Sequence, residues 1–155
     1  MIAGAALRRA QWSLTYPRSV DLPEAERRFR EARVAHLATV RPDGAPHVVP
    51  VVFVLQHETV WLVVDEKPKR TRELQRLANI RGEPRVSLLV DNYDEDWGGL
   101  WWVRIDGRAR IAEEGPELER CVELLTGRYP QERERRPTGP AIVVGIERWR
   151  YWPAA

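Results

Sequence analysis

The sequence predicts a small antiparallel β-barrel, a mainly β fold of the α+β class with about six strands and three short helices. Two observations lead to this prediction. Short apolar runs of strand length recur along the chain and are joined by turn residues, as in folds built from hairpins. No Gly-x-Gly-x-x-Gly or Walker-type loop occurs, so the sequence does not indicate a doubly wound nucleotide-binding sheet.

The composition is that of one globular domain. The chain has 155 residues, which is enough for a single core. Residues 1–20 show no clean periodicity, so we expect an N-terminal extension followed by a single domain over 21–155. Charged residues make up 31% of the chain, but the net charge is only +2. This balance argues against a nucleic-acid partner, because such proteins usually carry a basic face.

Cysteine usage and hydropathy indicate the compartment. Cys121 is the only cysteine, so an internal disulfide cannot form and a reducing compartment is expected. No apolar run reaches the ~18–20 residues that span a bilayer. Residues 1–6 lack the basic start of a signal peptide. We therefore expect a cytoplasmic protein with no membrane partner.

The first predicted elements are a helix and a hairpin. Asp21 or Leu22 caps the helix, which has Pro23 in its first turn and runs to about residue 32. A strand over 34–40 follows. The Asp43-Gly44 turn after this strand is a hairpin signal, because it lies between two apolar runs.

The second strand of the hairpin, over 46–55, is apolar on both of its faces. Such a strand lies in a barrel wall or under a partner subunit. Pro50 within it indicates a bulge or an edge position, since proline cannot donate to a ladder. A third strand is expected over 59–64.

The second half of the chain alternates between helices and strands. Its third helix should bury Leu118, Cys121, Val122 and Leu125, with Cys121 as a core residue. The expected elements are a helix over 70–79, a strand over 84–90, an acidic loop over 91–99, a strand over 100–111, a helix from 115, a solvated charge run over 131–136 and a strand over 141–152.

The segment Asp65-Glu66-Lys67-Pro68-Lys69-Arg70-Thr71 holds the only two lysines of the chain. It joins a predicted strand to a predicted helix, where backbone N–H groups are unpaired and the helix dipole favours an anion. Lys adds a point charge and Arg a planar fork that suits phosphate. A solvated basic turn is the simpler interpretation. Our hypothesis is that Lys67, Lys69, Arg70 and Thr71 bind the phosphate of a flavin-like cofactor.

Several runs resemble the pyridoxamine-phosphate-oxidase-like flavoproteins over roughly residues 22–152. The hairpin over 34–51 is similar to the opening hairpin of that family. Residues 84–90 resemble the next core strand, and 101–109 resemble the strand that ends in the Gly-x-Ala turn of the family. The 65–71 segment, taken with 93–97 and 100–104, is similar to the branch that uses the deazaflavin coenzyme F-420 rather than FMN.

The resemblance implies a split β-barrel that forms a homodimer with two cofactor sites at the dimer interface. It implies that the basic segment binds the cofactor phosphate, and that backbone near the ring comes from two strands. The implied ring-lining residues are His47, Val48, Val49, Pro50, Val51, Val64 and Asp65. Arg76 is an alternative phosphate ligand, because related proteins often carry Lys-x-x-Asn-Leu where this chain has Arg76, Asn79 and Ile80.

Other side chains carry weaker hypotheses. On the strand over 100–111, Trp101 shares a face with Val103, and Trp102 shares the other face with Arg104. This alternation makes Trp102 the candidate pocket wall and Trp101 a core residue. The three histidines, His36, His47 and His57, show no metal-ligand spacing, so no metal is expected.

We therefore expect a coenzyme F-420-dependent oxidoreductase that transfers hydride between the deazaflavin and a small organic substrate. The cofactor would supply the reactive ring and the protein its orientation. This would explain why no catalytic acid–base pair stands out, although His47 could donate a proton. The alternatives are an FMN-dependent oxidoreductase of the same fold, a non-catalytic carrier of the deazaflavin or flavin and, more distantly, a haem-handling split barrel.

Overall fold

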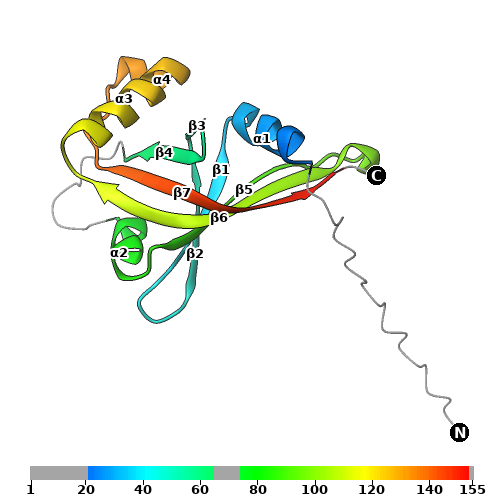
Figure 1. Cartoon of the computed structure of the whole chain (residues 1–155), viewed down its shortest axis with the longest axis horizontal. Coiled ribbons are helices and arrows are strands. Elements are labelled where there is room, and N and C mark those ends of the chain that lie inside the picture. Colours follow the sequence, from blue (N-terminus) through cyan, green and yellow to red (C-terminus); the bar gives the residue numbers. More distant parts are fainter. Residues whose placement is uncertain (1–20, 65–73, 154–155) are drawn as a thin grey trace, which may run out of the picture.

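The computed structural model describes residues 21–64 and 74–153, which form one curled antiparallel sheet with helices on its surfaces (Figure 1). The seven strands follow the order β2-β1-β5-β6-β7-β4-β3. The strands are β1 (Ala35–Val40), β2 (Pro46–Val51), β3 (Val54–Gln56), β4 (Thr59–Val63), β5 (Arg85–Asn92), β6 (Trp101–Ala112) and β7 (Ala141–Trp152). The helices are α1 (Leu22–Glu31), α2 (Gln75–Gly82), the short 3-10 helix η1 (Trp97–Gly99), α3 (Pro116–Arg128) and α4 (Pro130–Glu134).

The predicted opening hairpin is confirmed. β1 pairs with β2 from Ala35–Val51 to Val40–Pro46. Gly44 has a φ of +85°, which a residue without Cβ adopts readily. The Asp43 carboxylate accepts a hydrogen bond from the Ala45 N–H at 3.0 Å. β2 is an edge strand of the sheet, so Pro50 removes no donor from a central ladder.

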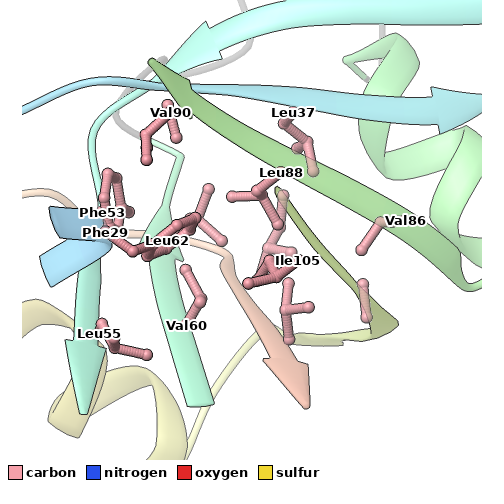
Figure 2. Close-up of a cluster of buried hydrophobic side chains, with 14 of the residues drawn as sticks. Phe29, Leu37, Phe53, Leu55, Val60, Leu62, Val86, Leu88, Val90 and Ile105 are labelled. Carbon is pink, nitrogen blue, oxygen red and sulfur yellow. The ribbon is translucent and has the colours of Figure 1, made fainter. Parts of the chain in front are cut away.

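One hydrophobic core fills the concave side of the sheet (Figure 2). Phe29 of α1 lies with its ring centroid 5.0 Å from that of Phe53 and 5.6 Å from that of Trp149. α2 adds Leu77 and Ile80 to the same cluster. A smaller cluster, which includes Cys121, lies between α3 and the opposite face of β4 and β7.

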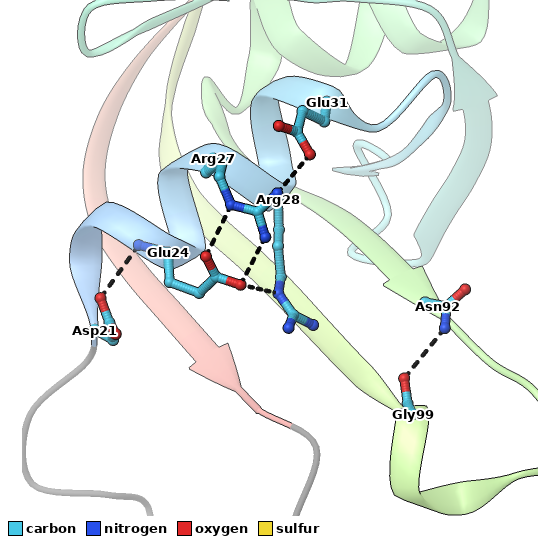
Figure 3. Close-up of polar contacts among 7 residues, drawn as sticks. All are labelled: Asp21, Glu24, Arg27, Arg28, Glu31, Asn92 and Gly99. Atoms are coloured by element: carbon cyan, nitrogen blue, oxygen red, sulfur yellow. Dashed lines mark hydrogen bonds and ion pairs between the residues drawn. The ribbon is translucent and has the colours of Figure 1, made fainter.

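Helix α1 begins and ends close to the predicted residues, and ion pairs follow its surface. Asp21 is the N-cap, and its carboxylate accepts from the Glu24 N–H at 3.2 Å. Arg27 and Arg28 donate to the Glu24 carboxylate (Figure 3), at 2.9 and 2.6 Å through their Nε atoms. These hydrogen bonds, that of Arg27 first, lower the pKa of Glu24 to about 2. The Arg28 guanidinium also stacks 4.8 Å from the centroid of a Trp101 ring.

The single strand expected over 46–55 is instead two strands, β2 and β3, separated at Val52 and Phe53. The break places Phe53 in the core. Its backbone groups bond to the end of α3 rather than to a neighbouring strand. The Tyr129 hydroxyl accepts from the Phe53 N–H at 3.2 Å, and the Phe53 carbonyl accepts from Tyr129 at 2.9 Å and from Arg128 at 3.0 Å.

The helix expected over 70–79 begins later than predicted. Leu74 is the N-cap of α2, with an extended ψ of 134°, and the helix runs from Gln75 to Gly82. Residues 65–73 lie outside the described part of the chain. The first turn of α2 therefore contains Arg76.

One further expectation needs correction. The charge run over 131–136 is not wholly solvated, because α4 forms within it and Glu132 is half-buried. The strand expected over 100–111 is confirmed, and the Gly-x-Ala sequence at 107–109 lies within it. β6 continues to Ala112 and shifts its register against β7 between Asp106 and Gly107.

Candidate cofactor site

A cavity of about 270 Å³ opens where the end of β2 meets β4, the start of β7 and the helices α2 and α4. Four predicted cofactor residues lie together in its wall. They are Pro50, Val51, Val64 and Arg76. The remaining wall is formed by Val52, Leu62, Val63, Glu132 and Ile142. The cavity thus combines an apolar wall with one cationic and one anionic side chain.

Arg76 owes its position to the way α2 is anchored. Leu77 and Ile80 face the core, and Asn79 is 1% exposed. The Asn79 amide donates to the Thr39 hydroxyl of β1 at 2.9 Å. With one side of the helix fixed in this way, Arg76 in the first turn lines the cavity. The α2 N-cap, Leu74, makes no side-chain capping bond, so the first turn lacks the side-chain acceptor that commonly satisfies such N–H groups.

Glu132 is the site residue that the sequence reasoning missed. It lies in a run of charged residues that shows no apolar periodicity, so the sequence offered no signal that one carboxylate faces inward. α4 is a short helix that begins at Pro130, directly after α3 ends. That placement brings Glu132 to a cavity whose other walls come from residues 50–52, 62–64, 76 and 142.

The strand β2 presents two different faces. Val48 and Pro50 are exposed on one side, whereas His47, Val49 and Val51 are half-buried on the other. His47 faces Thr39 across the β1–β2 ladder, and its Nδ1 atom lies 3.5 Å from the Thr39 hydroxyl oxygen. His47 is therefore on the α2 side of the strand.

Trp102 lies at a different place. It lines a shallow groove of about 400 Å³ with His36, Leu89, Asp91, Tyr93 and Arg104. Cross-strand pairs bring these residues together, since Leu89 pairs with both His36 and Arg104, and Asp91 pairs with Trp102. Arg104 is held by an ion pair with Asp106 at 3.1 Å. The groove shares no lining residue with the cavity of about 270 Å³ that contains Arg76, which we call the Arg76 cavity.

Trp101 and Trp102 lie on opposite faces of the sheet, as the alternation of side chains along the strand predicts. Trp101 packs against the core cluster, while Trp102 faces the groove on the opposite side of the sheet. The sequence favoured a structural or surface role for His36, and the structure places this residue beside Trp102 in the groove. Lys67, Lys69, Arg70, Thr71 and Asp65 lie outside the described residues.

Two further observations on the described residues concern metal ligands and membrane spans. Over 21–64 and 74–153, no group of three or more His, Cys, Asp or Glu side chains is placed to hold a metal ion. Within the same residues, no helix is long and apolar enough to cross a membrane.

Comparisons with known proteins agree with this architecture. The sequence profile described as pyridoxamine 5'-phosphate oxidase matches residues 22–153. A conserved hypothetical protein from Mycobacterium tuberculosis is 27% identical, with a TM-score of 0.66 over 88% of this chain and 86% of that one. No curated protein matches.

Two more distant structures show the same fold. An FAD-binding protein from Mesorhizobium loti is 21% identical, with a TM-score of 0.66 over 85% of this chain and 94% of that one. The haem storage protein from Vibrio cholerae is 17% identical, with a TM-score of 0.64 over 84% of this chain and 92% of that one.

Proposed function

Because the chain belongs to the pyridoxamine 5'-phosphate oxidase family, we propose that it is an oxidoreductase that binds coenzyme F-420 and acts on a small organic substrate. The observation that supports this proposal most directly is the Arg76 cavity. Pro50, Val51, Val64 and Arg76 were predicted from a family resemblance, and they line one cavity although they come from three parts of the fold.

The lining residues fit a ligand that has a planar apolar part and an anionic tail. Pro50, Val51 and Val64 offer apolar contact, and Arg76 offers a guanidinium for phosphate. Glu132 suits a different part of the ligand, since a carboxylate repels phosphate and can accept a hydrogen bond from a ring N–H. Lys67, Lys69, Arg70 and Thr71 remain part of the proposed phosphate site because the segment adjoins Val64.

In this proposal the cofactor supplies the reactive ring, and the protein binds and orients it. When bound, a deazaflavin supplies a ring that exchanges a hydride with its substrate. The chain binds the anionic tail, orients the ring along β2 and excludes water with the apolar wall. We assign no catalytic acid or base. His47 lies on the α2 side of β2, which supports a role as a hydrogen-bond donor to the ligand.

FMN is the alternative cofactor, and the similarity to an FAD-binding protein favours a flavin in general. Haem is a second candidate ligand for a separate reason. His36 lies beside Trp102, Tyr93 and Arg104 in the shallow groove that Trp102 lines. In such a set the histidine could ligate iron, the aromatic rings could contact the macrocycle and the arginine could pair with a propionate. The fold similarity to a haem storage protein adds to this observation.

A titration of the purified protein with F-420, FMN and haem separates these candidates. We expect F-420 to bind more tightly than FMN, as read by cofactor fluorescence, and haem to bind least. Preferential binding of FMN would favour the flavin enzyme, and preferential binding of haem would contradict the proposal. Tight F-420 binding without turnover on enones, quinones or nitro compounds would indicate a carrier.

Replacing Arg76 tests the phosphate site. Charge-assisted hydrogen bonds are each worth about 1.5–3 kcal/mol, so Arg76→Gln should weaken F-420 binding about 10- to 150-fold. Arg81→Gln is the matched control, because Arg81 lies on the same helix and pairs with Glu113 outside the cavity. The double variant Lys69→Ala/Arg70→Ala should weaken binding by at least as much. Wild-type affinity in both variants would place the phosphate elsewhere.

A further inference from the structure

A chain of four polar side chains, of which the middle two are buried, connects α2 to the strand that carries the predicted ring-binding residues. Apart from tyrosine and cysteine, the buried polar side chains among the described residues are Thr39, Asn79 and Thr126. The Thr126 hydroxyl donates to the Val122 carbonyl of its own helix at 2.8 Å. Thr39 and Asn79, at 2% and 1% exposure, instead bond to one another across two elements. A buried polar pair of this kind is costly unless its hydrogen bonds are made.

The hydrogen bonds of this chain run in one direction. Gln75 Nε2 donates to Asn79 Oδ1 at 2.8 Å, so the Asn79 oxygen is occupied as an acceptor. Asn79 Nδ2 therefore faces Thr39 and donates to its Oγ1 at 2.9 Å. The Thr39 hydroxyl still has its own hydrogen to donate. Within the described residues, the acceptor in reach of that hydrogen is His47 Nδ1 at 3.5 Å.

This direction determines which ring nitrogen of His47 carries the proton. A neutral imidazole has one N–H and one acceptor nitrogen. If Nδ1 carried the proton, Thr39 Oγ1 would accept twice and its own hydrogen would be buried without an acceptor. That arrangement is unfavourable, because an unsatisfied buried donor loses its hydration without compensation. Neutral His47 should therefore hold its proton on Nε2.

We propose that Thr39 and Asn79 are positioning residues that keep His47 in the Nε2–H tautomer, so that it donates a hydrogen bond to an acceptor atom of the ligand on β2. His47 is half-buried on β2, and its Nε2 has no partner among the described residues. The acceptor class is a carbonyl oxygen or an unprotonated ring nitrogen. This donor role rests on the proposed function, whereas the tautomer is a property of the protein alone.

The same chain also links α2 to β2, the two elements that carry the predicted phosphate ligand Arg76 and the predicted ring-binding residues. Gln75 adjoins Arg76 at the start of α2, and Asn79 lies one turn further along that helix. Thr39 belongs to β1, and His47 belongs to β2, three residues from Pro50. One set of four side chains thus fixes the helix that carries the predicted phosphate ligand and the histidine of the predicted ring strand.

The first experiment measures the tautomer in protein without ligand. Long-range 1H–15N spectra in alkaline buffer distinguish the two imidazole nitrogens, and His47→Gln assigns the His47 signals among those of the three histidines. We expect the proton on Nε2. A proton on Nδ1, or an even mixture, would overturn the proposal. The tautomer itself is read from the wild-type protein.

Variants then test whether Thr39 sets the tautomer. Thr39→Val removes the hydroxyl and should shift the His47 signals towards a mixture of tautomers. Thr39→Ser retains the hydroxyl and should restore the wild-type spectrum. Thr126→Val is the matched control, because its hydroxyl bonds within α3 and should leave His47 unchanged. Wild-type His47 signals in Thr39→Val would overturn the role of Thr39.

A second arm tests the donor role with F-420 and FMN as the probes. Binding should move the His47 Nε2 signal, and Thr39→Val should weaken the affinity about 2- to 12-fold, the effect of one ordinary hydrogen bond. An unmoved Nε2 signal in saturated protein would overturn the donor role. If the wild-type protein binds neither probe, the proposed function fails, and the tautomer result still decides the role of Thr39.

Discussion

Cys121 shows how burial sets the chemistry of a single residue in this fold. It is fully buried between α3 and the sheet, and its thiol donates to the Leu62 carbonyl at 3.1 Å. Burial, with a smaller contribution from the negative charge of Glu132, raises the pKa of this thiol from 9.0 to about 12. The nucleophilic form of cysteine is the thiolate, so this thiol is a core group rather than a reactive one.

Two measurements follow from the raised pKa of Cys121. A thiol reagent at pH 8 should leave the native protein unmodified and react fully after unfolding.

Between pH 9 and about 12, the folded protein also keeps the Cys121 proton that the unfolded chain loses. The contribution of the protonated thiol is complete below pH 9 and is lost as pH rises towards 12, by up to about 1.4 kcal/mol per pH unit. Cys121→Ala should lack this alkaline loss in chemical denaturation, and an identical pH profile in both proteins would contradict the assignment.

The candidate site could be predicted only in part at the level of residues. The family resemblance implied Pro50, Val51, Val64 and Arg76 as cofactor residues, and these four residues do line one cavity. The contribution of Glu132 could not be predicted, because it depends on how a distant helix folds back. Alternation along one strand predicted the face of Trp102, yet it could not show that this face looks away from the Arg76 cavity.

At the scale of elements, the register shift in β6 depends on one glycine. The shift lies between Asp106 and Gly107, where β6 pairs with β7. A Cβ atom on Gly107 would lie only 2.2 Å from the Gly145 carbonyl oxygen and 3.2 Å from a Val144 methyl group. Backbone cannot move aside as a flexible side chain can, so the close approach of these two strands requires glycine.

Gly107→Ala should therefore destabilise the protein by about 1–3 kcal/mol, the usual cost of overpacking. Gly127→Ala is the matched control, because a Cβ atom on Gly127 of α3 would meet nothing within 4 Å beyond the backbone of its own helix. That change should instead stabilise by about 0.5–1 kcal/mol, since alanine is the better helix former. Denaturant unfolding measures both changes, and equal stability of the two variants would contradict the prediction.

The errors in predicting elements have specific physical causes. The apolar run over 46–55 contains no turn residue at Val52 and Phe53, so nothing local marks the break. Hydrogen bonds from Arg128 and Tyr129 hold that backbone instead. The predicted start of α2 was wrong for a related reason. Charged residues that favour helices precede Leu74, while the anchor of the helix is the contact of Asn79 with a distant strand.

At the scale of the whole molecule, the helices leave one face of the sheet open. α1 and α2 pack on the core face, and α3 covers β3 and β4 with part of β7. The outer face, defined here by His36, Val48, Leu89, Trp102 and Trp152, has no helix over it among the described residues. The sequence anticipated this surface through the strand over 46–55, which is apolar on both sides. The sheet order, with β4 beside β7, depends on pairing between distant segments and could not be predicted.

Association of two copies through the outer face is our last prediction. Val48 is 59% exposed and Trp152 38% exposed, and apolar surface of this kind favours burial against a partner. Light scattering should show a dimer at micromolar concentration. Val48→Asp should shift it towards monomer without loss of folding, because a charge is costly to bury in an interface. Leu22→Asp is the control, since Leu22 is similarly exposed on α1, which packs on the core face. A wild-type monomer, or a Val48→Asp dimer as stable as the control, would contradict this arrangement and with it a cofactor site shared between two subunits.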